Sequence, residues 1–349
     1  MFARSPSWTW LPTMSKDTLS EVLRSVRLRG ALFFHVEGRD RWASEAPHAS
    51  EIARYVMPGI EHVMAYHVVT EGACWTGLID GEAVRLELGD VVVYPRGAPH
   101  SVTSHPGLRG VVDMAAYAQP RDQQLPVFSS RVGGDVRLGC ADSPPAPGSA
   151  TLVCGFFGCD ARPFNPLLAS LPELLHIRAR DGEDDRISQL VRFAVAESVE
   201  KRPGGEALLE RLSETMFVEL VRRYLEELPE DQNNWLAGLR DRYVGRALSC
   251  LHANPGEAWT IDRLADRVGL SRSALHERFG QFTGHAPMQY LARWRMQVAA
   301  GLLRHSAATV ASIAQEVGYE SEASFSRAFR RETGRPPATW RREQVRIAS

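Results

Sequence analysis

The stretch IAQEVGYESEASFSRAF, residues 313–329, has a counterpart earlier in the same chain, LADRVGLSRSALHERF at residues 264–279. Corresponding residues lie 49 positions apart before the central turn and 50 apart after it, because the second copy has one more residue in the turn. The matching pairs include Leu264 with Ile313, Ala265 with Ala314, Gly269 with Gly318, Ser271 with Ser321 and Phe279 with Phe329. A repeat in this register indicates one supersecondary unit used twice.

Each copy has the pattern of a helix-turn-helix. A threonine and a serine stand where their hydroxyls can cap the first and second helices. A glycine between them can adopt the left-handed conformation that ends the first helix. In the second helix, two apolar residues at i and i+4 then point toward the core. These residues are Thr260, Gly269, Ser271, Leu275 and Phe279 in the first copy, and Thr309, Gly318, Ser321, Phe325 and Phe329 in the second.

A connecting helix is predicted to begin at Pro287, since proline suits the first helical position. Its inward side chains are Leu291, Trp294, Val298, Leu302 and Leu303. About 18 residues at 1.5 Å each make a rod of roughly 27 Å. Successive major grooves on one face of B-DNA lie roughly 34 Å apart. The spacing predicts a unit that places two recognition helices in adjacent grooves.

The charge of the chain is divided unevenly along its 349 residues, although the total is only −1. From Asp241 to Ser349 there are 16 Arg, no Lys and 10 acidic residues, a net charge of +6, so the preceding part carries −7. A basic C-terminal third is typical of a segment that binds a polyanion. A solvated helical surface would give the same count, so the charge supports DNA binding only together with the repeat.

The N-terminal part, from Asp17 to about Pro172, reads as short strands separated by turns. Asp80-Gly81 is a strong hairpin signal, and in the strand after it Val84, Leu86 and Leu88 alternate with polar residues. Many short strands at this spacing predict a barrel or sandwich. Two helices follow over 186–228, broken at Pro203-Gly204-Gly205, and the polar run Pro229–Asn234 reads as a linker. The second helix has an apolar stripe that fits either core packing or a dimer seam: Leu209, Leu212, Met216, Val218, Leu220 and Tyr224.

The C-terminal residues 240–342 resemble the DNA-binding domain of the AraC/XylS family, most specifically in the second motif. The resemblance implies double-stranded DNA as a partner, and RNA polymerase is a further expected partner. A homodimer is expected through the apolar stripe of the helix at about 206–227. It assigns base-facing roles to Arg272, Ser273, His276 and Glu277 in the first recognition helix and to Glu322, Ala323, Ser324 and Arg327 in the second. Glu277 stands where many members of the family have a basic residue. A carboxylate can accept from cytosine N4 but repels phosphate, so this helix is expected to read a different DNA sequence. Phosphate contacts are expected among Arg330, Arg331, Arg341 and Arg342; the alternative for all these residues is a solvated helix face.

The N-terminal part resembles the cupin sensor domain of one branch of the same regulators. Residues 89–100, GDVVVYPRGAPH, match the second cupin motif, and His67 and Glu71 match the first. Ala65 stands where that motif usually has a further histidine, so three ligands remain: His67, Glu71 and His100. Three ligands and an open position suit a catalytic metal, whereas a decayed site suits a sensor. A barrel mouth lined by His67, Glu71, Trp75, His100 and His35 would suit a small-molecule effector.

We therefore predict an α+β multidomain regulator rather than an enzyme, with no cofactor. Its parts are a loose extension at 1–16, a cupin-like β-barrel sensor at 17–178, a helical linker at 179–234 and an all-α double helix-turn-helix domain at 235–349. The alternative is a metal-dependent cupin enzyme fused to a DNA-binding module. No apolar run reaches about 18 residues and Met1–Thr13 lacks a signal-peptide pattern, so no membrane span and a cytoplasmic location are expected, with Met14 as an alternative start.

The five cysteines, Cys74, Cys140, Cys154, Cys159 and Cys250, are too scattered for a disulfide framework. Cys154 and Cys159 suggest a redox sensor, but five residues apart on one strand they face opposite sides. Inert buried thiols are the alternative that this geometry favours.

Overall fold

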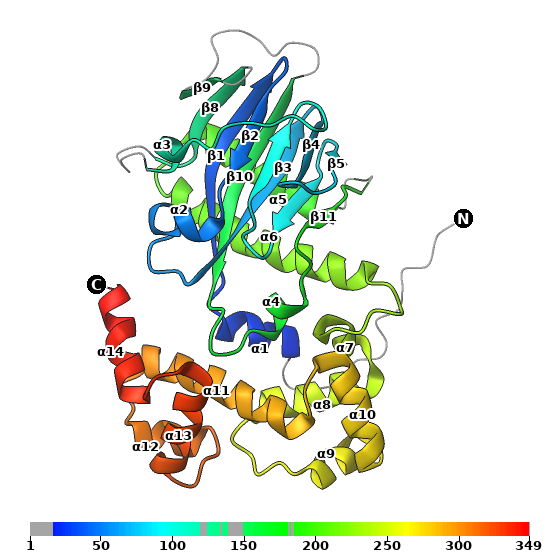
Figure 1. Ribbon diagram of the computed structural model, residues 1–349, viewed down its shortest axis with the longest axis vertical. Coiled ribbons are helices and arrows are strands. Elements are labelled where there is room, and N and C mark those ends of the chain that lie inside the picture. Colours follow the sequence, from blue (N-terminus) through cyan, green and yellow to red (C-terminus); the bar gives the residue numbers. More distant parts are fainter. Residues whose placement is uncertain are drawn as a thin grey trace. The chain divides into compact units, whose positions relative to one another are not determined.

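A computed structural model describes residues 17–118, 124–132, 135–138, 149–180, 182 and 185–348 (Figure 1). The predicted extension at 1–16 and Cys140 lie outside these residues. The chain forms two compact units. The first holds the described part of Met1–Val26, Arg162–Ser170 and Pro229–Ser349, and the second holds Arg27–Ala161 and Leu171–Leu228. We call the first the DNA-binding unit and the second the sensor unit, after the domains that their sequences resemble.

The sensor unit is built from two β-sheets, as the alternating pattern predicts. One sheet has the strand order β11-β6-β3-β10-β1-β8-β9 and the other β2-β7-β4-β5. The strands are β1 (Arg29–Arg39), β2 (Ala43–Ala46), β3 (His62–Glu71), β4 (Cys74–Leu78), β5 (Val84–Leu86), β6 (Val91–Tyr94), β7 (His100–Thr103), β8 (Val127–Val132), β9 (Asp135–Leu138), β10 (Ala150–Cys159) and β11 (Leu175–Ile177). The helices are α2 (Ala49–Val56), α3 (Met114–Tyr117), α5 (Arg186–Glu200) and α6 (Gly205–Glu227).

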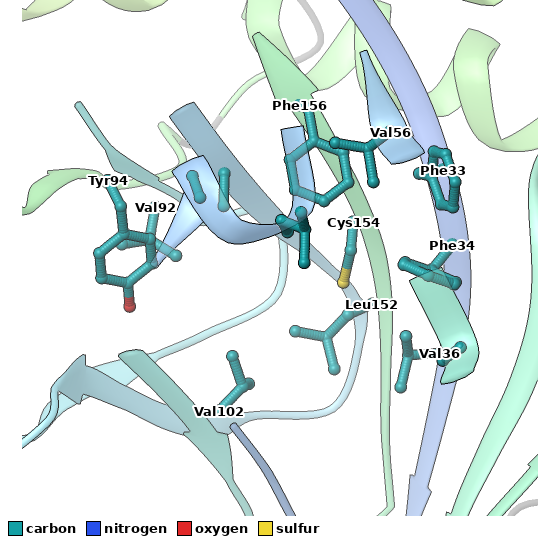
Figure 2. Close-up of a cluster of buried hydrophobic side chains, with 14 of the residues drawn as sticks. Phe33, Phe34, Val36, Val56, Val92, Tyr94, Val102, Leu152, Cys154 and Phe156 are labelled. Atoms are coloured by element: carbon teal, nitrogen blue, oxygen red, sulfur yellow. The ribbon is translucent and has the colours of Figure 1, made fainter. Parts of the chain in front are cut away.

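The interior of the sensor is filled by apolar side chains from both sheets. Figure 2 shows Phe34 and Val36 of β1 and Leu152, Cys154 and Phe156 of β10 converging on one cluster. The rings of Phe33 and Phe156 meet edge to face with centroids 5.7 Å apart. Among such apolar side chains a polar group costs free energy unless it finds a hydrogen-bond partner.

Helix α6 lies against the outer face of the larger sheet. Phe217 contacts Phe157 of β10 with ring centroids 4.9 Å apart, and a side chain at Gly30 of β1 would collide with Ser213. Leu209, Met216 and Leu220 are accordingly buried within one chain. The interpretation of this stripe as a dimer seam is therefore wrong for these three residues, because the sensor's own sheet already covers them.

The DNA-binding unit is all-helical. It contains α7 (Trp235–Arg240), α8 (Arg242–Ala253), α9 (Ile261–Val268), α10 (Arg272–Thr283), α11 (Pro287–His305), α12 (Val310–Glu316), α13 (Glu322–Thr333) and α14 (Pro337–Ala348), together with α1 (Thr18–Ser25) and α4 (Pro166–Ser170). Gln297 of α11, which is 1% exposed, holds these distant segments. Its side chain accepts a hydrogen bond from Phe164 N and donates one to Ser25 O, both at 3.0 Å.

Candidate nucleic-acid interface and sensor site

Both predicted helix-turn-helix motifs form with the caps that the sequence indicates. Thr260 and Thr309 accept hydrogen bonds from the free backbone N–H groups at the starts of α9 and α12, at 3.2 and 3.1 Å. Ser271 and Ser321 do the same for α10 and α13, at 3.2 Å each. The glycines of the two turns, 269 and 318, have φ of +82° and +81°, a region that other residues rarely adopt. Each recognition helix therefore has a defined first turn.

The recognition helices are anchored by aromatic and aliphatic residues on their inner face. Leu275, Phe279, Phe325 and Phe329 are all fully buried. The opposite face is open, and the structure places all eight sequence-predicted residues on α10 and α13. Seven of them are exposed: Arg272, Ser273, His276, Glu277, Glu322, Ala323 and Arg327. The eighth, Ser324, is half-buried and its hydroxyl donates to the Ser321 carbonyl at 2.8 Å, so it also stabilises the first turn of α13.

The arginines expected to contact phosphate do not form one group. Arg330 and Arg331 are exposed on α13. Arg341 of α14 instead donates to the carbonyls of Leu303 at 3.0 Å and Ala308 at 2.6 Å. Its guanidinium therefore secures the end of α11, a role that a sequence pattern cannot indicate because any residue offers a carbonyl.

Asp241 and Arg278 form a contact that the sequence analysis missed. Asp241 caps α8 by accepting from the N–H groups of Tyr243 and Val244. Its carboxylate also pairs with the guanidinium of Arg278 on α10, and Asp241 is the less exposed partner. Burial acts to raise the pKa of Asp241, but these hydrogen bonds outweigh it and the pKa lies below its ordinary value. The pair fixes the first recognition helix against α8.

The sensor interior contains a pair of histidines, His67 of β3 and His100 of β7, with Nε2 atoms 2.8 Å apart. Nδ1 of His100 lies 2.9 Å from the carbonyl of Ala98, so this nitrogen carries the proton. Nε2 of His100 must then accept, and Nε2 of His67 must donate. Nδ1 of His67 is left as a bare acceptor, buried and without a hydrogen-bond partner.

Tyr94 completes the surroundings of this pair. Its ring stacks on His100 with centroids 3.7 Å apart, and its hydroxyl shares a 2.5 Å hydrogen bond with Thr76. Burial lowers the pKa of His100 to about 4 and that of His67 well below its ordinary value. Both imidazoles are therefore neutral at pH 7, as the tautomer assignment requires.

Glu71, Trp75 and His35 are not brought to the histidine pair. Glu71 is exposed at the end of β3 and accepts a hydrogen bond from Thr151 at 3.0 Å. Thr76 points inward, so alternation along β4 places Trp75 on the other face. His35 alternates likewise with the inward Phe34 and stacks on Phe128 at 4.8 Å. Among the described residues, no three His, Cys, Asp or Glu side chains could hold a metal ion together, so the donor set does not fit a cupin metal centre.

Cys154 and Cys159 are not placed to form a disulfide with each other. Cys154 and Cys159 both lie on β10, whose ladder to β3 is continuous between them. Cys74, Cys154 and Cys250 are buried free thiols, and Cys159 is buried as well. Burial raises the pKa of the Cys154 thiol, with the nearby Cys74 adding to the effect. A high pKa suppresses the thiolate that oxidants attack.

Two helix-turn-helix motifs on one connecting helix, carried with a cupin-type domain, define a DNA-binding regulator. Family models agree: residues 17–226 match a cupin family and residues 264–343 a helix-turn-helix domain family. An AraC-like transcription regulator of Streptomyces lividans is 33% identical over 93% of this chain and 98% of its own length. The chain belongs to the AraC family of transcriptional regulators, with an N-terminal cupin domain and a C-terminal DNA-binding domain.

Other relatives extend the comparison. The regulator AlkR of Acinetobacter baylyi is 27% identical over 94% of this chain and 99% of its own. The DNA-binding domain of AdpA, solved with a target DNA, is 31% identical and covers 30% of this chain and 96% of its own, with a TM-score of 0.29. These relatives are transcriptional regulators and not enzymes, as predicted for this chain. No helix among the described residues is long and apolar enough to cross a membrane.

Proposed function

We propose that the chain is a one-component cytoplasmic regulator that reads a two-part DNA site with α10 and α13 and is controlled by a small molecule at the sensor. The observation that supports the DNA-reading part is the shared design of α10 and α13. Each is capped at its first turn, anchored on one face and open on the other. Exposed side chains in the first two turns of such a helix can reach base edges in a major groove.

Arg327 is proposed to contribute the most base specificity. It is exposed between the buried Phe325 and Phe329, and it makes no ion pair or hydrogen bond with any described residue. A guanidinium there can hold guanine O6 and N7 in bidentate fashion. Arg272, by contrast, lies 3.2 Å from the carboxylate of Asp262. This contact uses Nε of Arg272 and leaves its other N–H groups open to a base or a phosphate.

The signal is proposed to act at the His67–His100 pair. Nδ1 of His67 is an unpaired acceptor in an apolar interior, and leaving such a group unpaired costs about 1–3 kcal/mol. A small, largely apolar molecule with one hydrogen-bond donor would satisfy it. Binding would shift the regulator only by the difference in affinity between its two states. A redox signal is less well supported, because the described thiols are buried and burial raises the pKa of the Cys154 thiol.

A homodimer is proposed to form through α5 rather than α6. Phe193 and Val199 of α5 are 47% and 57% exposed, and Ala196 lies between them on the same side of the helix. An open apolar stripe of this kind is typical of an interface. RNA polymerase is proposed as a further partner only from the family resemblance.

The experiment that tests the DNA-reading proposal is selection of duplexes by the full-length protein from a randomised library. The expected product is a site with two conserved blocks about one helical turn apart. Footprinting on the host genome would then give the operator and the neighbouring genes. Enrichment of a single block, or of no sequence, would contradict the proposal.

A further inference from the structure

Arg295, midway along α11, contacts both helix-turn-helix motifs at once. Its Nε donates to the carbonyl of Pro255 at 2.7 Å and its Nη2 to that of Glu257 at 2.9 Å. Both carbonyls belong to the segment that leads into α9. Its Nη1 donates to the carbonyl of Gly318 at 3.3 Å, in the turn between α12 and α13. One planar guanidinium thus joins the entry of the first motif to the turn of the second.

The two motifs also meet backbone to backbone beside this arginine. A Cβ at Gly256 would lie 2.3 Å from the carbonyl oxygen of Glu316, and a Cβ at Gly318 would lie 2.6 Å from that of Gly256. No side chain fits at either position at these distances. We call Gly256, Gly318 and Arg295 the inter-motif seam. The two backbones therefore lie so close that their own atoms resist a further approach of a few tenths of an ångström.

The chemistry of Arg295 suits a rigid joint. No carboxylate faces it among the contacts described, and its Cζ lies over the Tyr319 ring, 5.8 Å from the centroid. Burial lowers its pKa, but an arginine remains charged at pH 7. Charge-assisted hydrogen bonds from a rigid fork to three fixed carbonyls leave little freedom. Arg293, elsewhere on α11, also reaches α13 through Glu332 at 2.6 Å, but that partner is a partly exposed side chain that can rotate.

We propose that Arg295 is a positioning residue that sets the separation and rotation of the two recognition helices, and so the spacing specificity of the regulator, without contacting DNA. The reason is that the seam holds the segments immediately before α9 and α13, and α9 in turn packs against α10. The inference rests on the proposed function in one respect: both recognition helices must bind one duplex together.

The test measures the affinity of the full-length chain for three kinds of duplex. The first has the two blocks of the selected site at their natural spacing, the second has the spacing changed by one or two base pairs, and the third has one block scrambled. Each base pair rotates the second block by about 35°. For the native chain we expect the shifted duplexes to bind about tenfold or more weakly. For Arg295→Met we expect about a tenfold loss on the native site, less than a twofold change on the single block, and a flattened spacing profile.

Three further variants separate positioning from folding. Arg295→Lys keeps the charge but not the fork, and should flatten the profile partly. Gly256→Ala leaves Arg295 in place and forces the seam apart, so it should change the preferred spacing. Arg304→Met, on the same helix but bonded to Gln344 of α14, is the matched control and should keep the native profile.

Equal losses on single and double blocks, or unchanged profiles in folded variants, would overturn the inference. If Arg295→Met fails to fold by circular dichroism, the lysine and Gly256→Ala variants decide on the same criterion. A native chain that shows no dependence on spacing would instead contradict the joint binding that the proposed function requires.

Discussion

His252 of α8 makes the folding of the DNA-binding unit sensitive to acid. It is 2% exposed and stacks on Trp294 with ring centroids 3.9 Å apart. Nε1 of Trp235 donates to the Tyr290 hydroxyl at 2.7 Å, and that hydroxyl donates to Nε2 of His252 at 2.8 Å. Nδ1 is buried without a partner. A proton on the acceptor nitrogen would break the chain of hydrogen bonds and add an unpaired charge, so burial lowers the pKa of His252 to about 3.

The magnitude follows from the difference between folded and unfolded states. An unfolded histidine has a pKa of about 6.5, so below that pH the unfolded chain binds a proton that the folded chain excludes. The contribution of the neutral His252 to the free energy of unfolding is therefore fully present above about pH 6.5 and is lost as the pH falls. Between pH 7.5 and 5 the loss is about 2 kcal/mol from His252 alone. Any folded pKa below about 4 gives the same loss, because the folded ring is then still neutral at pH 5.

The assay compares the full-length chain with His252→Gln, whose amide oxygen can accept from Tyr290 and does not titrate. Urea unfolding at pH 7.5, 6.5 and 5 is followed by pulsed hydrogen exchange in peptides from α8 and α11, so the DNA-binding unit is read separately from the sensor. The difference in unfolding free energy between the two proteins should change by about 2 kcal/mol from pH 7.5 to 5. Parallel pH profiles would refute the reasoning, since they would mean that the ring is not held neutral.

The remaining predictions concern DNA, effector and assembly. Arg327→Ala should relax the preference at one base pair by about 1–3 kcal/mol and leave non-specific affinity nearly intact. Binding to a duplex library is measured at two salt concentrations. If Arg327 contacts phosphate instead, all sequences should lose affinity alike and the slope of log affinity against log salt should fall by about one. In a thermal-shift screen, alcohols and phenols should stabilise the native chain more than their methyl ethers do, and His67→Phe should abolish the difference; equal shifts would exclude the proposed donor. Light scattering of Phe193→Glu with Val199→Glu should show monomers, and a folded dimer would place the interface elsewhere.

The helix-turn-helix motifs were predictable from sequence because their signals are local. Thr260 and Ser271 cap helices that begin at the next residue, and Gly269 has its positive φ whatever surrounds it. Such features depend on backbone geometry within a few positions, so a repeat of the same residues repeats the structure. The buried faces of α10 and α13 follow from i, i+4 spacing for the same reason.

The sensor was predictable in class but less so in detail. The cupin motifs correctly brought His67 to His100, since both lie on strands whose inward face is set by alternation. Trp75 and His35 were expected at the same place, but each lies on a strand whose inward residue is its neighbour, Thr76 or Phe34. A motif identifies the strand, and an error of one residue in phase moves a side chain to the other face. The stripe on α6 shows the complementary difficulty, because an apolar face does not indicate which surface covers it.

The inter-motif seam was beyond sequence reasoning for a different physical reason. Arg295 bonds three carbonyl groups, and every residue has one, so the acceptors leave no trace in residue type. Gly318 is already required by the turn, where its φ is +81°. A glycine at 318 is also required by the close approach of Gly256, but the sequence gives no separate sign of this second requirement. The parts of this protein that we propose to read bases are side chains, and residue type alone was enough to suggest them. The part that spaces those readers consists of backbone atoms held by one arginine, so only the folded structure can reveal it, and DNA of altered spacing is the probe that responds to it.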